Sequence, residues 1–223
     1  MMRLLAVLTA MALFAPLASA EPSSAVAFDV ATVRLLATAD PARGEALAKE
    51  SKCAKCHGDA GVSDDPEDTN IAGLSASYMY KQLKDYQAGN RDDRDMLKKT
   101  RDLDDGQLAD LAAWFASQEP APVATDRNTD PAILQLVYHG DPRRLLKACA
   151  SCHGRDGRGG QFDHPALAGQ YPEYLVYTLT EFKEGDRTND IYSRMRHIAE
   201  ALTEEEINGL AGYYATAVPE EEE

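Results

Sequence analysis

Two stretches of the chain share the pattern Cys-x-x-Cys-His-Gly, at residues 53–58 and 149–154. A Cys-x-x-Cys-His run is the attachment signature of c-type haem. The thiols of each motif add across the haem vinyl groups, and the adjacent histidine is placed to bind the iron from one side. The residues concerned are Cys53, Cys56 and His57 in the first copy and Cys149, Cys152 and His153 in the second. Because these motifs use all four cysteines, the sequence predicts two covalently bound haem c groups and no structural disulfide.

A haem iron bound by one histidine has an open sixth position, and its occupant decides between electron transfer and reactivity toward small molecules. Met96 lies in a polar stretch 40 residues after Cys56, and Met195 lies in the matching place 43 residues after Cys152. Each methionine precedes an aromatic pair by 18 residues. Both could instead be gap-filling core residues, but the shared position favours axial iron ligands.

Other candidate ligands lack a counterpart in the opposite half of the chain. Met79 faces no methionine at position 175 and is expected in the core, whereas His139, His164 and His197 are expected at the surface or in packing. A zinc site is the alternative interpretation of the paired cysteines. It would leave the adjacent histidines and both ligand-candidate methionines without a role.

The motifs belong to an internal duplication with an offset of 96 residues. The matched pairs beyond the motifs are residues 71–73 with 167–169, Tyr78 with Tyr174, Leu83 with Leu179, Tyr86 with Phe182, Gly89 with Gly185, and Arg91 with Arg187. The offset becomes 99 further on, where Met96 meets Met195, and 101 upstream, where Asp29 meets Asp130. A repeat of this length exceeds solenoid periods and indicates a duplicated domain.

Within each half the local signals are helical. Asp40-Pro41 and Asp141-Pro142 each supply an N-cap followed by proline at the first helical position, so both are expected to begin helices that run into the haem motifs. Further helices are predicted over 77–88 and 172–184, each stopped by a glycine. A last helix follows Asp104 and Thr203, where capping boxes are predicted. No stretch shows a sustained period of two, so the fold class is predicted as all-α.

The first 20 residues predict a secretory signal peptide: Arg3, an apolar run over 4–17, and small residues at 18–20. An uncleaved membrane anchor is disfavoured because the run is shorter than the ~20 residues needed to span a bilayer. Cleavage after Ala20 leaves 203 of the 223 residues. Export to the periplasm fits the motifs, since haem is attached to c-type apoproteins after they leave the cytoplasm.

We expect the mature chain to contain two small domains. The predicted segments are a signal peptide at 1–20, a first monohaem domain at 21–118, a linker at 119–129, a second monohaem domain at 130–218 and an acidic tail at 219–223. The linker is identified by two prolines and a lack of periodicity. The formal charge of −14 becomes −15 when the leader, with Arg3 as its one charged side chain, is removed. Nucleic acid is therefore excluded as a partner, and the acidity serves either solubility or steering toward a basic partner.

Each half resembles a class I cytochrome c domain. The first resemblance rests on the motif at 53–58, residues 71–73, Met96 and the helix over 103–115. The second rests on the motif at 149–154, residues 165–170 and 187–190, Met195 and the stretch 202–214. Together the halves are similar to dihaem cytochromes of the c4 type over nearly the whole mature chain. The fold implied is two tandem class I cytochrome c domains, packed with their haems close together.

The resemblance also implies a function and partners. It implies a periplasmic one-electron carrier with a low-spin haem in each domain, held between histidine and methionine. The expected partners are redox-protein donors and acceptors, among them a membrane-bound quinol oxidoreductase or a terminal oxidase, and peripheral membrane association is compatible with this role. Arg91 and Arg187 are candidates to pair with haem propionates; exposed arginines on a charged turn are the alternative.

The halves differ in ways that predict different reduction potentials. Pro165 sits where such domains place a proline whose neighbourhood orients the proximal imidazole, but the first half has Thr69 there. His57 is therefore expected to have different outer contacts from His153, and such contacts tune the iron potential. Gln170 likewise matches Leu74 of the first half in the duplication. The loop over 58–70 carries five acids and no base, whereas the loop over 154–166 carries two of each.

Three functions compete. A dihaem electron carrier is favoured, because methionine ligation raises the potential and closes the iron to small ligands. The same chain could instead be the haem subunit of a larger dehydrogenase, which predicts a stable complex on purification. A dihaem peroxidase is less favoured, because it needs one iron with an open position. We therefore predict an electron-transfer protein rather than an enzyme.

Overall fold

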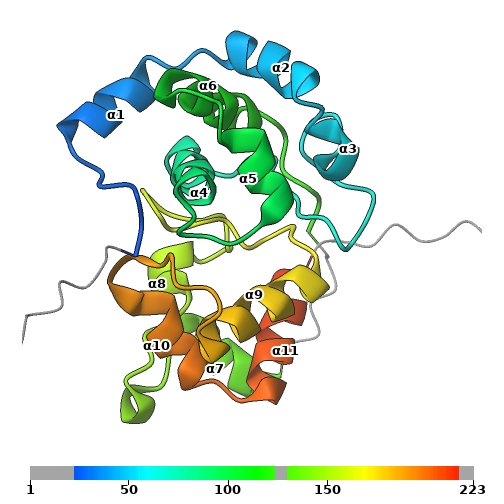
Figure 1. Cartoon of the computed structure of the whole chain (residues 1–223). Helices are drawn as coiled ribbons and strands as arrows, with labels where there is room; N and C mark the ends of the chain where they lie inside the picture. The colour runs from blue at the N-terminus through cyan, green and yellow to red at the C-terminus, as the bar shows by residue number, and fades with distance from the viewer. Residues whose placement is uncertain (1–22, 124–129, 216–223) are drawn as a thin grey trace, which may run out of the picture.

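The computed structural model of the protein describes residues 23–123 and 130–215. Figure 1 shows two helical lobes, one formed by the first half of the chain and one by the second. The described part contains helices and two isolated β-bridges but no strand. The predicted all-α fold is confirmed. The predicted signal peptide, most of the linker and the acidic tail lie outside the described residues.

The helices follow the duplication. The first lobe contains α1 (Val30–Ala37), α2 (Pro41–Glu50), α3 (Ala54–His57), α4 (Ala76–Ala88), α5 (Arg94–Thr100) and α6 (Asp105–Ala116). The second contains α7 (Pro131–Tyr138), the 3₁₀ turn η1 (Pro142–Arg144), α8 (Ala150–His153), α9 (Pro172–Glu184), the 3₁₀ turn η2 (Ile191–Ser193), α10 (Arg194–Glu200) and α11 (Glu204–Tyr214). Among the described residues, no helix is both long enough and apolar enough to cross a membrane.

The predicted caps set the helix ends. Asp104 and Thr203 each accept a hydrogen bond from the backbone three residues on, and both capping boxes are complete. Gly89 and Gly185 end α4 and α9 in the left-handed conformation, as expected from their sequence positions. These four helices form a matched pair in each lobe, with α4 packed on α6 and α9 packed on α11.

One helix prediction is wrong. Asp40-Pro41 begins α2, but Asp141-Pro142 begins only the three-residue turn η1. The second half has five fewer residues between this proline and the first cysteine of the motif, which is too short for a helix such as α2. Instead Leu145 ends the turn with a φ of 58°, and Asp141 pairs with Leu146 in a short bridge.

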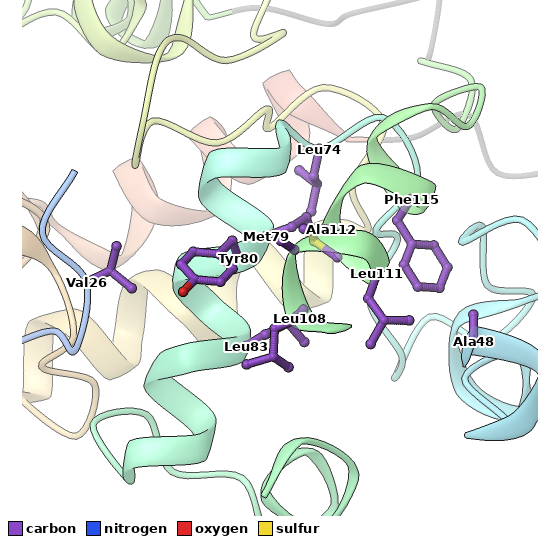
Figure 2. Close-up of a cluster of buried hydrophobic side chains, with 11 residues drawn as sticks. Val26, Ala48, Leu74, Met79, Tyr80, Leu83, Leu108, Leu111, Ala112 and Phe115 are labelled. Carbon is purple, nitrogen blue, oxygen red and sulfur yellow. The ribbon is translucent and has the colours of Figure 1, made fainter. Parts of the chain in front are cut away.

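Each lobe has its own apolar core. In the first, side chains from α4 and α6 face one another, including Leu83 and Leu108 (Figure 2), and Leu108 is fully buried. In the second, residues of α7, α9 and α11 form the cluster, with Val137 fully buried. Separate cores fit a duplicated domain, because each unit buries its own apolar surface.

Arg144 makes the second lobe sensitive to acid. Its guanidinium donates to both oxygens of Glu206, at 2.8 and 2.7 Å, and to Asp141 at 2.8 Å. These bonds lower the pKa of both carboxyls below their usual values. The stability they contribute is present above the unfolded-state pKa values, near 4, and is lost as pH falls through the lower folded values.

We therefore expect Arg144→Gln to lower the thermal midpoint at pH 7 and to flatten the loss of stability below about pH 5. Thermal unfolding followed by circular dichroism across pH 3–7 measures both effects. Arg143→Gln is the control, because the neighbouring Arg143 makes no side-chain ion pair within the described ranges. A wild-type midpoint and pH profile in Arg144→Gln would contradict this role.

Candidate functional site

The two histidines of the motifs have the same local geometry. His57 ends the four-residue α3 and His153 ends α8, directly after the cysteines. Gly58 and Gly154 follow with φ values of 70° and 80°, and a side chain at Gly58 would collide with the carbonyl of Val62. The glycine of each motif thus lets the chain turn away immediately after the histidine.

Each imidazole is oriented by one backbone carbonyl. His57 Nδ1 lies 3.0 Å from the Thr69 oxygen, and His153 Nδ1 lies 2.8 Å from the Pro165 oxygen. Such a bond places the proton on Nδ1 and leaves Nε2 as the metal-binding nitrogen. The expectation of different outer contacts for His57 is wrong in this respect, because the acceptor is a backbone oxygen that threonine supplies as well as proline.

None of the four cysteines is paired in a disulfide. Cys56 is exposed and the other three are half-buried. Burial raises the pKa of Cys53, and it raises the pKa of Cys149 to about 11. One helical turn separates the two cysteines of each motif, so both lie on the same side of α3 or α8 as covalent attachment of one group requires.

The candidate methionines lie on short helices that the sequence analysis missed. Met96 is half-buried on α5, where it packs against the first core, and Met195 is half-buried on α10. Helix α5 packs on α4, and α10 packs on α9, so both occupy the corresponding place in their lobes. Asp93 starts α5 by accepting hydrogen bonds from the Asp95 and Met96 amides.

The remaining candidates take the places expected of them. Met79 is buried in the first core with 6% of its surface exposed. His139 and His197 are exposed, and His164 lies 2.7 Å from an Arg194 nitrogen. Within the described ranges, no three or more His, Cys, Asp or Glu side chains converge as a structural zinc site requires.

The donor groups fit haem c. Each lobe offers two free thiols one turn apart, an imidazole with an uncommitted Nε2, and a half-buried thioether. This set matches the needs of covalent attachment and of two axial ligands. The two sites differ in burial, since His153 is 8% exposed whereas His57 is half-buried, and burial lowers the pKa of His153.

Two arginines meet between the lobes. Arg91 donates to the Tyr174 hydroxyl at 2.9 Å, and its counterpart Arg187 approaches the Tyr78 hydroxyl at 3.4 Å, so each arginine reaches the tyrosine of the opposite lobe. Arg187 is 5% exposed and Arg91 is partly buried. Neither takes part in an ion pair among the described residues.

The surroundings of these arginines are electropositive. Burial alone would raise the pKa of Tyr174, but the charges of Arg91 and Arg187 outweigh it and lower that pKa to about 8. A buried cation normally has an anionic partner. The arrangement therefore suits anionic groups such as propionates, as the sequence analysis expected for one interpretation of these arginines.

Polar residues for which the sequence predicted no such contact also join the lobes. Lys81 Nζ lies 2.6 Å from Asp85 Oδ2 and donates to the Asn189 carbonyl at 2.6 Å, and all three residues are buried. Gln170 exchanges two hydrogen bonds with the backbone of Asn70, at 3.0 and 2.8 Å. These contacts fix the relative position of the lobes.

The N-terminal segment adds a second connection. The Ser24 hydroxyl and the Ala25 amide both donate to Asp85 at 2.8 Å, and the Ser23 hydroxyl donates to the Asp190 carbonyl of the second lobe at 2.9 Å. The segment 23–25 therefore bridges the lobes.

Comparison with known proteins points to one family. The family model for cytochrome c matches residues 41–119 and again 143–217. A cytochrome c4 from Azotobacter vinelandii is 37% identical over 186 residues, which cover 77% of this chain and 89% of the relative. A thiosulfate dehydrogenase electron acceptor from Stutzerimonas stutzeri is 33% identical and covers 73% of this chain and 77% of the relative.

A solved structure is similar as well. The crystal structure of reduced recombinant cytochrome c4 from Pseudomonas stutzeri superposes with a TM-score of 0.73 at 31% identity. The match covers 80% of this chain and 99% of that one. The two-lobed arrangement is thus shared with a solved cytochrome c4.

Proposed function

The chain belongs to the cytochrome c family, as a dihaem protein of the c4 type with two covalently bound haem c groups, and from this premise we propose that it is a periplasmic one-electron carrier. Relatives of this type are electron-transfer proteins rather than enzymes. The observation that carries the proposal is the repetition, in both lobes, of two free thiols beside a histidine whose Nδ1 is tied to a carbonyl.

The residues of each lobe hold and enclose the redox group. The thiols would tether it, and Nε2 of His57 or His153 would bind the iron from one side. Met96 and Met195 would bind it from the other side, so their thioethers would keep small molecules from the iron. When bound, the haem supplies an iron that alternates between ferric and ferrous states. The protein moves no proton and binds no substrate in this scheme.

Arg91 and Arg187 neutralise propionates between the lobes. Neither arginine has a carboxylate partner in the described part of the chain, and this and the lowered pKa of Tyr174 support the role. Guanidinium matches carboxylate geometry. Placing both arginines at the contact between the lobes would bring the two redox groups near one another, which suits transfer from one to the other.

A haem count, an absorption spectrum and carbon monoxide binding test the proposal. We expect two haems per chain, a weak near-red band from methionine to ferric iron, and no rapid binding of carbon monoxide after reduction. Rapid binding at one haem would contradict the simple carrier and favour a peroxidase.

A second candidate function is that of electron acceptor within a dehydrogenase system. The similarity to a thiosulfate dehydrogenase electron acceptor favours it. It predicts co-purification with a catalytic subunit from the native host, whereas a free carrier elutes alone. Further partners would then be a membrane-bound quinol oxidoreductase as a donor and a terminal oxidase as an acceptor, both reached by peripheral association with the membrane.

We expect the second haem to have the higher reduction potential. The second motif is followed by Arg155 and Arg158, and positive charges disfavour the extra positive charge of the ferric state. The first motif is followed by five acids, which favour the ferric state. Spectroelectrochemical titration should show two steps. The double variant Asp64→Asn with Asp65→Asn should raise the lower potential, that of the first haem, and this increase should be smaller at high salt. Two indistinguishable haems in the wild-type chain would contradict the prediction.

A further inference from the structure

Gln82 has an unusual position between the lobes. It lies on α4 with 6% of its surface exposed, and its amide oxygen accepts three hydrogen bonds. The donors are Arg91 at 2.9 Å, Arg187 at 3.2 Å and Asn189 at 3.0 Å. Arg91 belongs to the first lobe and the other two belong to the second. One oxygen thus joins the arginines of both halves.

More donors surround this oxygen than can form hydrogen bonds of equal geometry to it. An amide oxygen offers two lone pairs, so three donors compete for two favourable directions. A movement of Arg91 toward another anion frees the oxygen for Arg187, and the reverse also holds. Because the site is buried, such a change is weakly screened by solvent.

The link exists on one side of the duplication only. The residue that matches Gln82 is Thr178, whose hydroxyl makes no hydrogen bond to Arg91 or Arg187 among the described residues. Its side chain is too short to reach both arginines. Gln82 therefore breaks the symmetry of the interface.

We propose that Gln82 is a positioning residue that couples the two haem sites through its shared oxygen. The inference rests on the proposed function, in which Arg91 and Arg187 each face the propionates of a haem. One electron from a donor protein lowers the charge of one site by one unit. The arginine that would face that site is then attracted more strongly by the more negative haem, so its bond to Gln82 weakens and the shared oxygen turns toward the other arginine. No covalent bond forms and no proton is transferred.

The test compares two glutamines of one helix. Gln82→Met removes the shared oxygen with little change in volume. Gln87→Met is the control, because Gln87 lies on the same helix and donates to the Thr100 and Leu103 carbonyls of its own lobe. Gln82→Glu keeps an acceptor and adds a negative charge. Redox titration followed by NMR gives each haem's potential with the other haem oxidised or reduced, and small-angle X-ray scattering reports whether the lobes stay together.

The interaction constant is the ratio of two equilibrium constants for reduction of one haem, one measured with the other haem oxidised and one with it reduced. We expect Gln82→Met to bring this constant at least threefold closer to a value of one, the value for independent haems, while the radius of gyration stays unchanged. Gln87→Met should not change the constant. Gln82→Glu should lower the reduction potentials of both haems. A wild-type interaction constant in Gln82→Met, an equal change in Gln87→Met, or a change that accompanies separation of the lobes would overturn the inference. If the wild-type chain lacks two reducible haems, the proposed function fails instead.

Discussion

Met96→Ala is expected to abolish the near-red methionine-to-iron band at one haem and to leave it at the other. Met96 is half-buried on α5 against the first core, in the place that Met195 takes in the second lobe. Alanine cannot bind iron, so the sixth position of the first haem opens. Because methionine ligation raises the potential, the first haem should also become harder to reduce, and the reduced variant should bind one equivalent of carbon monoxide.

Met79→Leu is the matched control for this experiment. It removes a thioether from the same core while conserving volume, which costs less than about 1.5 kcal/mol. Its near-red band should be that of the wild-type protein. Met195→Ala should affect the other haem, and the double variant should lose the band entirely. An unchanged spectrum in Met96→Ala would refute the ligand assignment.

The parts of the site that depend on local chemistry were predictable from sequence. The motifs at 53–58 and 149–154 and both capping boxes use residues a few positions apart, and their geometry follows from those residues. The carbonyl that orients each histidine was not predictable from residue type. It belongs to Thr69 in one lobe and Pro165 in the other, and every residue has such a group.

The contact between the lobes could not be predicted from the sequence, for a different reason. Lys81 and Asp85 are spaced as i and i+4, which in a sequence is typical of an exposed pair on a helix. Their counterparts Tyr177 and Glu181 do form such a pair, with Tyr177 58% exposed. The same spacing is buried in the first lobe because the segment 23–25 and Asn189 cover it, and that cover comes from distant parts of the chain.

The duplication therefore describes the lobes better than it describes their contact. Each lobe repeats the thiols, the imidazole and the methionine, but Gln82 and Lys81 are replaced by Thr178 and Tyr177, and Glu181, the counterpart of Asp85, is only half-buried. Two similar sites become unequal through residues outside the haem motifs. Differences in potential and coupling between the sites then come from the interface and from the acidic loop over 58–70.

Asp85→Ala is expected to destabilise the protein by about 3–5 kcal/mol, the cost of breaking a buried ion pair. Asp85 is fully buried and accepts hydrogen bonds from Lys81, Ser24, Ala25 and Asn189. The variant leaves the Lys81 ammonium, which is 2% exposed, without its carboxylate. It also releases the segment that bridges the lobes. Urea unfolding of the holoprotein at pH 7 measures the loss, and Glu181→Ala, at the matching half-buried position, should cost far less.

The pH dependence separates the charge from the lost packing. Burial lowers the pKa of Lys81, and the attraction of Asp85 opposes that effect. Without Asp85 the folded-state pKa of Lys81 falls further below its unfolded value near 10.4. Between these two pKa values the unfolded state binds more protons than the folded state, so the stability of Asp85→Ala rises with pH. The loss of unfolding free energy in Asp85→Ala should therefore become smaller as pH rises toward 10. Adding Lys81→Met to Asp85→Ala should restore part of the stability at pH 7. A deficit below about 1 kcal/mol, or one that is independent of both pH and Lys81, would show that the buried pair does not hold the lobes together.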